Sequence, residues 1–227
     1  MAIKRLLMPE IKTTPVSDKN VLEIYLDGTD DFLIPLVFPD YKIHVLDSET
    51  ISFFGIKFSI PEIKASYLGH AGVLLINGKT GLTKYYEYGR YYNTEPPGFV
   101  RKGNISDVKI KSGMISEKSL KNTLKEISFE HGQSGSISGV IIRGQLFIQA
   151  NQWLINIQKN NSNKSRKPYA LDDHNCMTFV IDLVDSLGLD SSWRPPVVIP
   201  TAYIEQFQLQ QVDLEYNFDT DTLEVKD

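Results

Sequence analysis

The chain has 227 residues, of which 41% are hydrophobic and 23% are charged, and this length and composition suit one main globular core. Its 24 basic and 28 acidic residues give a net charge of -4, and because no segment gathers Lys and Arg along one face, we expect no nucleic-acid partner. The single Cys excludes an intramolecular disulfide and a thiolate-rich zinc site, and we expect neither a metal ion nor a cofactor.

The N-terminus carries two basic residues, followed by an apolar run that ends at Pro9. This run is too short for the hydrophobic part of a Sec signal peptide. No stretch of the sequence approaches the roughly 18 apolar residues that a membrane-spanning helix needs. We therefore expect a soluble protein that is made in the cytoplasm, has no Sec signal and does not span a membrane.

Segments rich in β-branched and aromatic residues, separated by turn residues such as Asp-Gly and Pro-Asp, occupy the first part of the chain. They predict short strands over 21–26, 32–38, 41–46 and 51–60. We expect residues 1–62 to form a β-rich segment that packs on a core domain of residues 63–227.

A hairpin signal follows. An apolar run over 71–77 leads into Asn77-Gly78, and an aromatic run follows over 82–92. An Asn-Gly pair between two such runs is typical of a β-hairpin. His70 is therefore expected at the start of one strand, and Glu87 on its neighbour.

The second half of the chain predicts helices. Ser116 precedes apolar residues that recur at i, i+4 and i+7, and Gly132 follows them, which predicts a helix between the two. The same spacing predicts a second helix over 145–159, ahead of a polar loop over 159–167. A third helix should begin after the capping run Asp172-Asp173-His174-Asn175 and end at Gly188, which places Cys176 in its first turn.

Beyond this helix, prolines predict an extended segment, Thr201 can cap a short helix, and the acidic tail from Asp213 predicts one last strand. A run of strands followed by helices that pack on one side of them predicts the α+β class.

Cys176 is the candidate nucleophile. A thiol attacks as its thiolate, and a free pKa of about 8.5 leaves little thiolate at neutral pH unless a helix N-terminus or an imidazolium favours it. A lone Cys beside an apolar stripe is also typical of a small buried hydrophobe. Its position directly after a capping run favours a side chain that is presented for chemistry.

The chain has four histidines that could serve as the base. His44 alternates with apolar residues in a predicted strand, and His131 lies at a helix end, where it complements the dipole. His174 is two residues from Cys176, and side chains with that spacing on a helix point in different directions. His70 has small neighbours that let a helix N-terminus come close, and we predict it to be the base.

A base of this kind needs a third group that fixes its tautomer. Glu87 stands alone among aromatic residues and is our candidate, although a salt bridge with Arg90 or Lys84 would also explain it. Asp172 and Asp173 are alternatives that capping explains well.

The tyrosines over 85–92 are typical of a half-buried strand whose hydroxyls lie at the rim. A cleft wall for a sugar or a peptide is the alternative, and Tyr88 is the candidate for that substrate contact.

Two strings carry a resemblance: Asn175-Cys176-Met177-Thr178-Phe179-Val180 and, earlier in the chain, Gly69-His70-Ala71-Gly72-Val73. With the histidine before the cysteine, they resemble the circularly permuted NlpC-type cysteine hydrolases, a group that includes YiiX-like proteins and lecithin:retinol acyltransferase-like enzymes. The resemblance covers residues 66–187. It implies a papain-like α+β fold in which an antiparallel sheet packs against helices.

The same resemblance implies that Cys176 is the nucleophile, His70 the general base and Glu87 the third member. Tyr169 corresponds to a tyrosine upstream of the nucleophile in many NlpC enzymes, and we expect it and Asn175 to contact the substrate. The acyltransferase branch often has a second histidine as third member, and this chain has none at the equivalent strand, which disfavours that branch.

The segment over 85–92, with Pro97-Gly98-Phe99-Val100-Arg101 after it, resembles hydrolase effectors of type VI secretion of the TseH kind. This implies an antibacterial effector that cleaves an amide bond of peptidoglycan stem peptides in the target-cell periplasm, with an immunity protein and a delivery component as partners. Two alternatives stay open. One is a thioesterase, lipid acyl hydrolase or acyltransferase, and the other is a non-catalytic binding module on the same fold.

Overall fold

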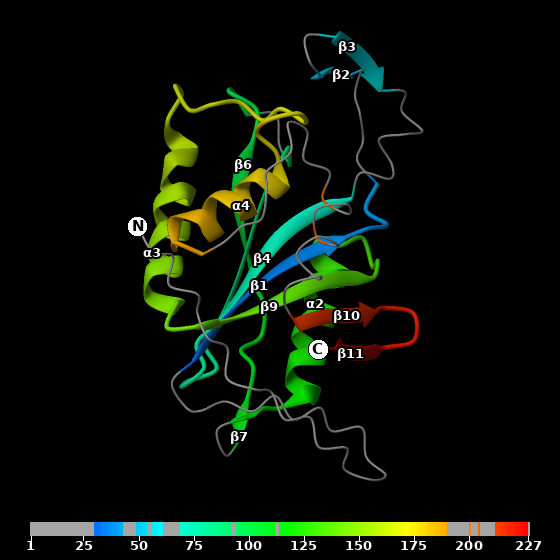
Figure 1. Cartoon of the computed structure of the whole chain (residues 1–227), viewed down its shortest axis with the longest axis vertical. Helices are drawn as coiled ribbons and strands as arrows, with labels where there is room; N and C mark the ends of the chain where they lie inside the picture. Colours follow the sequence, from blue (N-terminus) through cyan, green and yellow to red (C-terminus); the bar gives the residue numbers. More distant parts are fainter. Residues whose placement is uncertain are drawn as a thin grey trace.

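The computed structural model describes residues 30–42, 49–53, 56–60, 69–91, 94–111, 114–189, 200, 204 and 212–226. These residues form a seven-stranded sheet with the spatial order β11-β10-β9-β1-β4-β5-β6 (Figure 1). Every neighbouring pair in it is antiparallel. With helices packed against this sheet, the fold is of the α+β class, as the sequence predicts.

The strands of the large sheet are β1 (Asp31–Phe38), β4 (His70–Ile76), β5 (Thr83–Gly89), β6 (Phe99–Gly103), β9 (Ile137–Gly144), β10 (Val212–Asn217) and β11 (Thr222–Lys226). Two small hairpins stand apart from it and consist of β2 (Glu49–Phe53) with β3 (Ile56–Ile60), and of β7 (Ile110–Lys111) with β8 (Met114–Ile115). The helices are α2 (Glu117–His131), α3 (Phe147–Lys159) and α4 (Cys176–Ser186), and a 3-10 turn over Asn160–Ser162 follows α3. None of the described helices has the length and hydropathy that crossing a bilayer requires.

Helices cover both faces of the sheet (Figure 1). On one face, side chains such as Val37 and Val73 pack with α3 and α4 in one core cluster. On the other face, side chains such as Leu36 and Leu74 pack with α2 in a second cluster. The expectation that the helices lie on one side is therefore wrong. β1 and β4 are apolar along nearly their whole length, so each of their faces needs a cover.

Most of the predicted elements are present. The helix between Ser116 and Gly132 is confirmed as α2. The predicted helix over 145–159 is present as α3 and begins two residues later than predicted. The Asn-Gly pair lies in the turn between the antiparallel strands β4 and β5, as predicted. The predicted last strand is a hairpin of two strands, β10 and β11. β6 and β9 were not predicted.

The predicted strand over 21–26, most of the strand over 41–46, the proline-rich segment and the body of the helix after Thr201 lie outside the described residues. The prediction of one strand over 51–60 is wrong, because this stretch contributes to two paired strands, β2 and β3, of a hairpin.

β1 connects the two predicted parts of the chain. It comes from the expected N-terminal segment, yet it pairs with β4 on one side and with β9 on the other, at the centre of the large sheet. Residues 31–38 thus contribute to the same core as residues 70–144. The proposed boundary at residue 62 stays a prediction.

Candidate active site

The N-terminus of α4 is fixed by Asn175. Its side-chain oxygen accepts hydrogen bonds from the Met177 and Thr178 main-chain N–H groups at 2.9 and 3.0 Å, and the Thr178 hydroxyl bonds back to the Asn175 N–H at 2.9 Å. This capping box satisfies donors that an open helix end leaves unpaired. The Asn175 amide also donates to Leu171 O at 2.7 Å. The side chain is thus occupied by structural contacts, and its expected contact with substrate stays a prediction.

We expect Asn175→Ala to lower the free energy of unfolding by about 1 kcal/mol, because the first turn of α4 loses its cap. Urea denaturation followed by circular dichroism measures this loss. Ser116→Ala is the matched control, since Ser116 is the N-cap of α2 but its side chain makes no capping hydrogen bond. Equal losses for the two variants would show that the Asn175 cap adds no stability.

His70 is the first residue of β4 and follows Gly69, whose φ of 73° favours glycine. The imidazole is buried. It stacks on Phe38 with ring centroids 6.1 Å apart, and it contacts the Tyr41 ring at 4.8 Å and the edge of Tyr91 at 6.0 Å. Aromatic rings thus hold the imidazole in one orientation.

Glu87 lies on β5 opposite Gly72 of β4, so its carboxylate reaches the histidine one strand away. His70 Nε2 is 3.0 Å from Glu87 Oε2, and the Tyr91 hydroxyl lies 2.7 Å from the same nitrogen. An ionised carboxylate only accepts hydrogen bonds, so the shared proton belongs to Nε2. Nδ1 is then the ring nitrogen that remains for Cys176.

The Glu87 carboxylate is fully buried and has four side-chain partners among the described residues. Besides His70, Tyr85 donates to Oε2 at 2.9 Å, and on Oε1 the Arg101 Nε lies at 2.6 Å and the His131 Nδ1 at 2.7 Å. Burial alone would raise the pKa of Glu87, but hydrogen bonds and charges from His131 and His70 hold it well below its usual range. Glu87 is therefore a fixed negative charge.

The Cys176 side chain is 2% exposed and lies within hydrogen-bonding reach of His70. Burial by itself lowers the pKa of His70. The negative charge of the Cys176 thiolate and a hydrogen bond with it, followed by the contact with Glu87, outweigh burial and raise that pKa to about 9. The fold thus places a thiol, an imidazole and a carboxylate in series at the junction of α4, β4 and β5.

Sequence reasoning missed part of this cluster. Arg101 on β6 and His131 at the end of α2 both contact Glu87, whereas the sequence favoured a dipole role for His131. Besides the two histidines, Arg101 pairs with Glu87, where the sequence suggested Arg90 or Lys84. No local signal marks these contacts, because the two residues lie 14 and 44 positions from Glu87 and only the fold joins them.

Other candidates lie elsewhere. Asp173 forms an exposed ion pair with Lys167 at 2.9 Å. His174 Nδ1 lies 3.2 Å from the Tyr88 hydroxyl and 2.9 Å from Pro168 O. Both residues therefore have partners away from the Cys176 thiol and the His70 ring.

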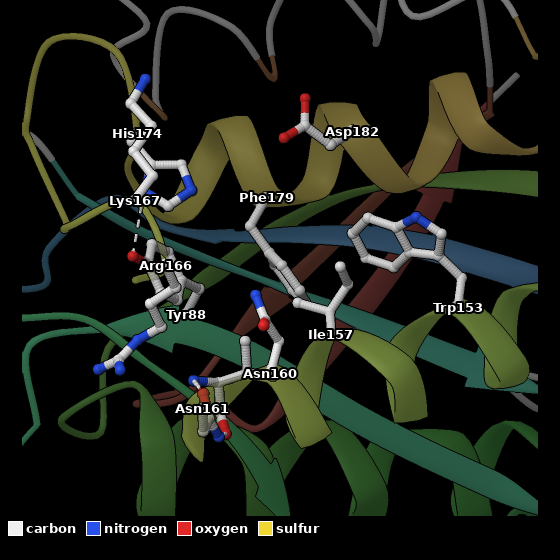
Figure 2. A pocket seen from close by; sticks show the side chains of 11 residues that line it. Tyr88, Trp153, Ile157, Asn160, Asn161, Arg166, Lys167, His174, Phe179 and Asp182 are labelled. Carbon is white, nitrogen blue, oxygen red and sulfur yellow. Dashed lines mark hydrogen bonds between the residues drawn. The ribbon is translucent and has the colours of Figure 1, made fainter. Parts of the chain in front are cut away.

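The two tyrosines expected to contact substrate lie together on the opposite face of β5. The rings of Tyr88 and Tyr169 are 5.4 Å apart and nearly buried. Tyr88 lines a pocket between α3 and α4, together with residues such as Trp153 and Phe179 (Figure 2). Tyr169 is not among the lining residues, and its main-chain N–H donates to Pro97 O at 2.8 Å. A substrate contact by either tyrosine stays a prediction.

Comparison with known proteins gives two matches. A family model described as "Type VI secretion system effector TseH-like" matches residues 33–190. A crystal structure described as that of the type VI secretion system effector TseH is 53% identical, covers 88% of this chain and 100% of its own, and superposes with a TM-score of 0.77. No curated protein matches the chain.

Proposed function

The chain belongs to the TseH-like family of type VI secretion effectors, and from this premise we propose that it acts as a cysteine hydrolase with Cys176, His70 and Glu87 as its catalytic residues. The observation that carries the proposal is the contact of His70 with both Cys176 and the buried Glu87 carboxylate. A helix that begins at the cysteine and an antiparallel sheet that carries the histidine support the permuted NlpC-type, papain-like architecture.

In the proposed mechanism, the Cys176 thiolate attacks the carbonyl carbon of an amide while His70 carries the proton. His70 then donates that proton to the nitrogen of the leaving amine, and the C–N bond breaks to give a thioester. Water attacks the thioester as His70 takes one of its protons. The acid product leaves and the thiolate is restored.

The tetrahedral intermediate carries a negative oxygen that needs a donor. Asn175 occupies the N–H groups of Met177 and Thr178, which leaves the Cys176 N–H as the donor at this helix end. Glu87 accepts from Nε2 and so keeps Nδ1 directed at the sulfur.

The proposed substrate is an amide bond in the peptidoglycan stem peptide. Membership of a family of type VI secretion effectors supports delivery into a target cell. We further propose that the protein acts in the periplasm of that cell and that an immunity protein protects the producer. These points rest on the family and on the resemblance to NlpC-type hydrolases.

Digestion of purified peptidoglycan, followed by mass spectrometry of the fragments, tests this function. We expect the protein to create new amine termini within stem peptides and Cys176→Ser to create none, because a hydroxyl is a far weaker nucleophile here than a thiolate. Unchanged termini with the intact protein would contradict the amidase. Release of fatty acids from lipid or thioester substrates would instead favour an acyl hydrolase, and inertness on all of these substrates a binding module.

A further inference from the structure

A second feature of the molecule is a pocket of about 170 Å³ between α3 and α4, over β5 and β6 and on the face of β5 that carries Tyr88 (Figure 2). Tyr88, Phe179 and Trp153 form a row of aromatic rings in it, with centroids 6.3 and 5.6 Å apart. Aromatic rings together with a few polar side chains are typical of the lining of sites for small ligands or peptide segments. The catalytic role proposed for Cys176 does not use it.

One end of the pocket is cationic, because Arg166 and Lys167 lie there beside Tyr88 (Figure 2). The acceptors of Arg166 among the described residues are main-chain carbonyl oxygens, those of Pro96, Gly98 and Asn163. No carboxylate among these acceptors neutralises its charge.

The positive charge of Arg166 acts on the Tyr88 side chain, which lines the pocket. Burial raises the pKa of Tyr88 to about 12, and the positive charges of Arg166 and Arg90 oppose that rise. The lining residues include one carboxylate, Asp182, which lies on α4 beyond Phe179. The end near Tyr88 is therefore suited to a negative group.

Lys167 adds a cation that can change partners. Its ammonium pairs with Asp173 at 2.9 Å, and both side chains are more than half exposed. An exposed pair of this kind contributes little free energy, because water competes for both charges. Lys167 can therefore exchange Asp173 for a carboxylate of a ligand at small cost.

The pocket adjoins the proposed nucleophile along the chain. His174 stands two residues before Cys176, and Phe179 stands three residues after it, within the first turn of α4. With a rise of about 1.5 Å per helical residue, the Phe179 side of the pocket begins roughly one turn from Cys176. His174 and Phe179 therefore flank Cys176 in the sequence, so the pocket and the proposed nucleophile share the start of α4.

We propose that this pocket binds a carboxylate-bearing segment of a peptide, with the carboxylate beside Arg166 and Lys167 and an apolar part against Phe179 and Trp153. We also propose that the neighbouring amide of that peptide is the one presented to Cys176. This second statement rests on the proposed hydrolase function, whereas the binding itself does not.

Isothermal titration of Cys176→Ala protein with the stem tetrapeptide L-Ala-γ-D-Glu-meso-diaminopimelate-D-Ala tests the binding without turnover. We expect Lys167→Glu to weaken binding about 10-fold or more, and Trp153→Ala to weaken it as well. Amidation of the peptide carboxylates should have an effect similar to that of Lys167→Glu. Lys164→Glu is the matched control, because Lys164 is exposed in the same loop and does not line the pocket.

Equal affinities for Lys167→Glu and Lys164→Glu, equal affinities for the free and amidated peptides, or no binding at all would overturn the pocket assignment. Lys167 is exposed, so its variant is expected to fold, and circular dichroism verifies this. A failed digestion of peptidoglycan would leave the titration result standing, so the two proposals fail separately.

Discussion

His70→Ala is expected to lower the rate of amide cleavage by about 10³-fold or more at pH 7, because both proposed proton transfers lose the group that makes them. The same change should slow the alkylation of Cys176. The pKa of His70 is raised to about 9, so the ring keeps its proton through the neutral range, and its positive charge favours the thiolate.

The chain has one Cys, so iodoacetamide consumption followed by intact-mass spectrometry reports on Cys176 alone and needs no substrate. We expect the rates of His70→Ala and the unchanged protein to differ at least about 10-fold at pH 7 and to converge near pH 10. Above pH 9 the unchanged protein loses the proton of His70, and thiols ionise without help above about 8.5. The comparison of two pH values also controls for limited access to a buried sulfur.

His174→Ala is the matched control for this experiment. His174 is close to Cys176 in sequence, but its Nδ1 contacts Pro168 O and the Tyr88 hydroxyl. Its removal should leave the alkylation rate within about threefold at both pH values, because it contributes no charge to the thiolate. If His70→Ala and the unchanged protein react at equal rates at pH 7, the proposed ion pair does not exist.

Local sequence signals were sufficient to place the three proposed catalytic residues on their elements. The capping run before Cys176 and the Asn-Gly turn between β4 and β5 each act over a few residues, so propensity and turn chemistry determine them. The sequence singles out Glu87 as a candidate because a lone acid in an aromatic strand needs a partner. Its burial is then a consequence of the register that sets it opposite Gly72.

Long-range features could not be predicted in the same way. β9 contains Gly139 and Arg143, which weaken a strand pattern, and it is held in place by pairing with β1 and β10 on either side. The contacts of Arg101 and His131 with Glu87 likewise require β6 and α2 to meet at one face of the sheet. The helices on both faces of the sheet, in contrast, have a cause in the sequence. β1 and β4 are apolar on both faces, and such strands need a cover on each side.

Glu87→Gln is expected to reduce both stability and reactivity. The amide keeps the shape of the side chain but removes the negative charge that Arg101, His131 and His70 share. Breaking a buried ion pair by removing one partner costs about 3 kcal/mol or more, because the opposite charge stays buried without compensation. Urea denaturation at pH 7 measures this loss. Glu130→Gln is the control, since Glu130 is exposed on α2, and its free energy of unfolding should change by less than about 0.5 kcal/mol.

The pH dependence of this loss identifies the charge as its cause. The pKa of Glu87 is lowered in the folded state, so its carboxylate adds stability above the pKa of an unfolded glutamate, about 4.3, and that contribution declines as the pH falls below this value toward the folded pKa. The difference in free energy of unfolding between the unchanged protein and Glu87→Gln should therefore be constant between pH 5 and 7 and shrink below about pH 4. A difference that stays constant through this acid range would mean that the negative charge of Glu87 is not the cause of the loss. His70 should then retain its orientation, and Cys176 its alkylation rate, in the glutamine variant.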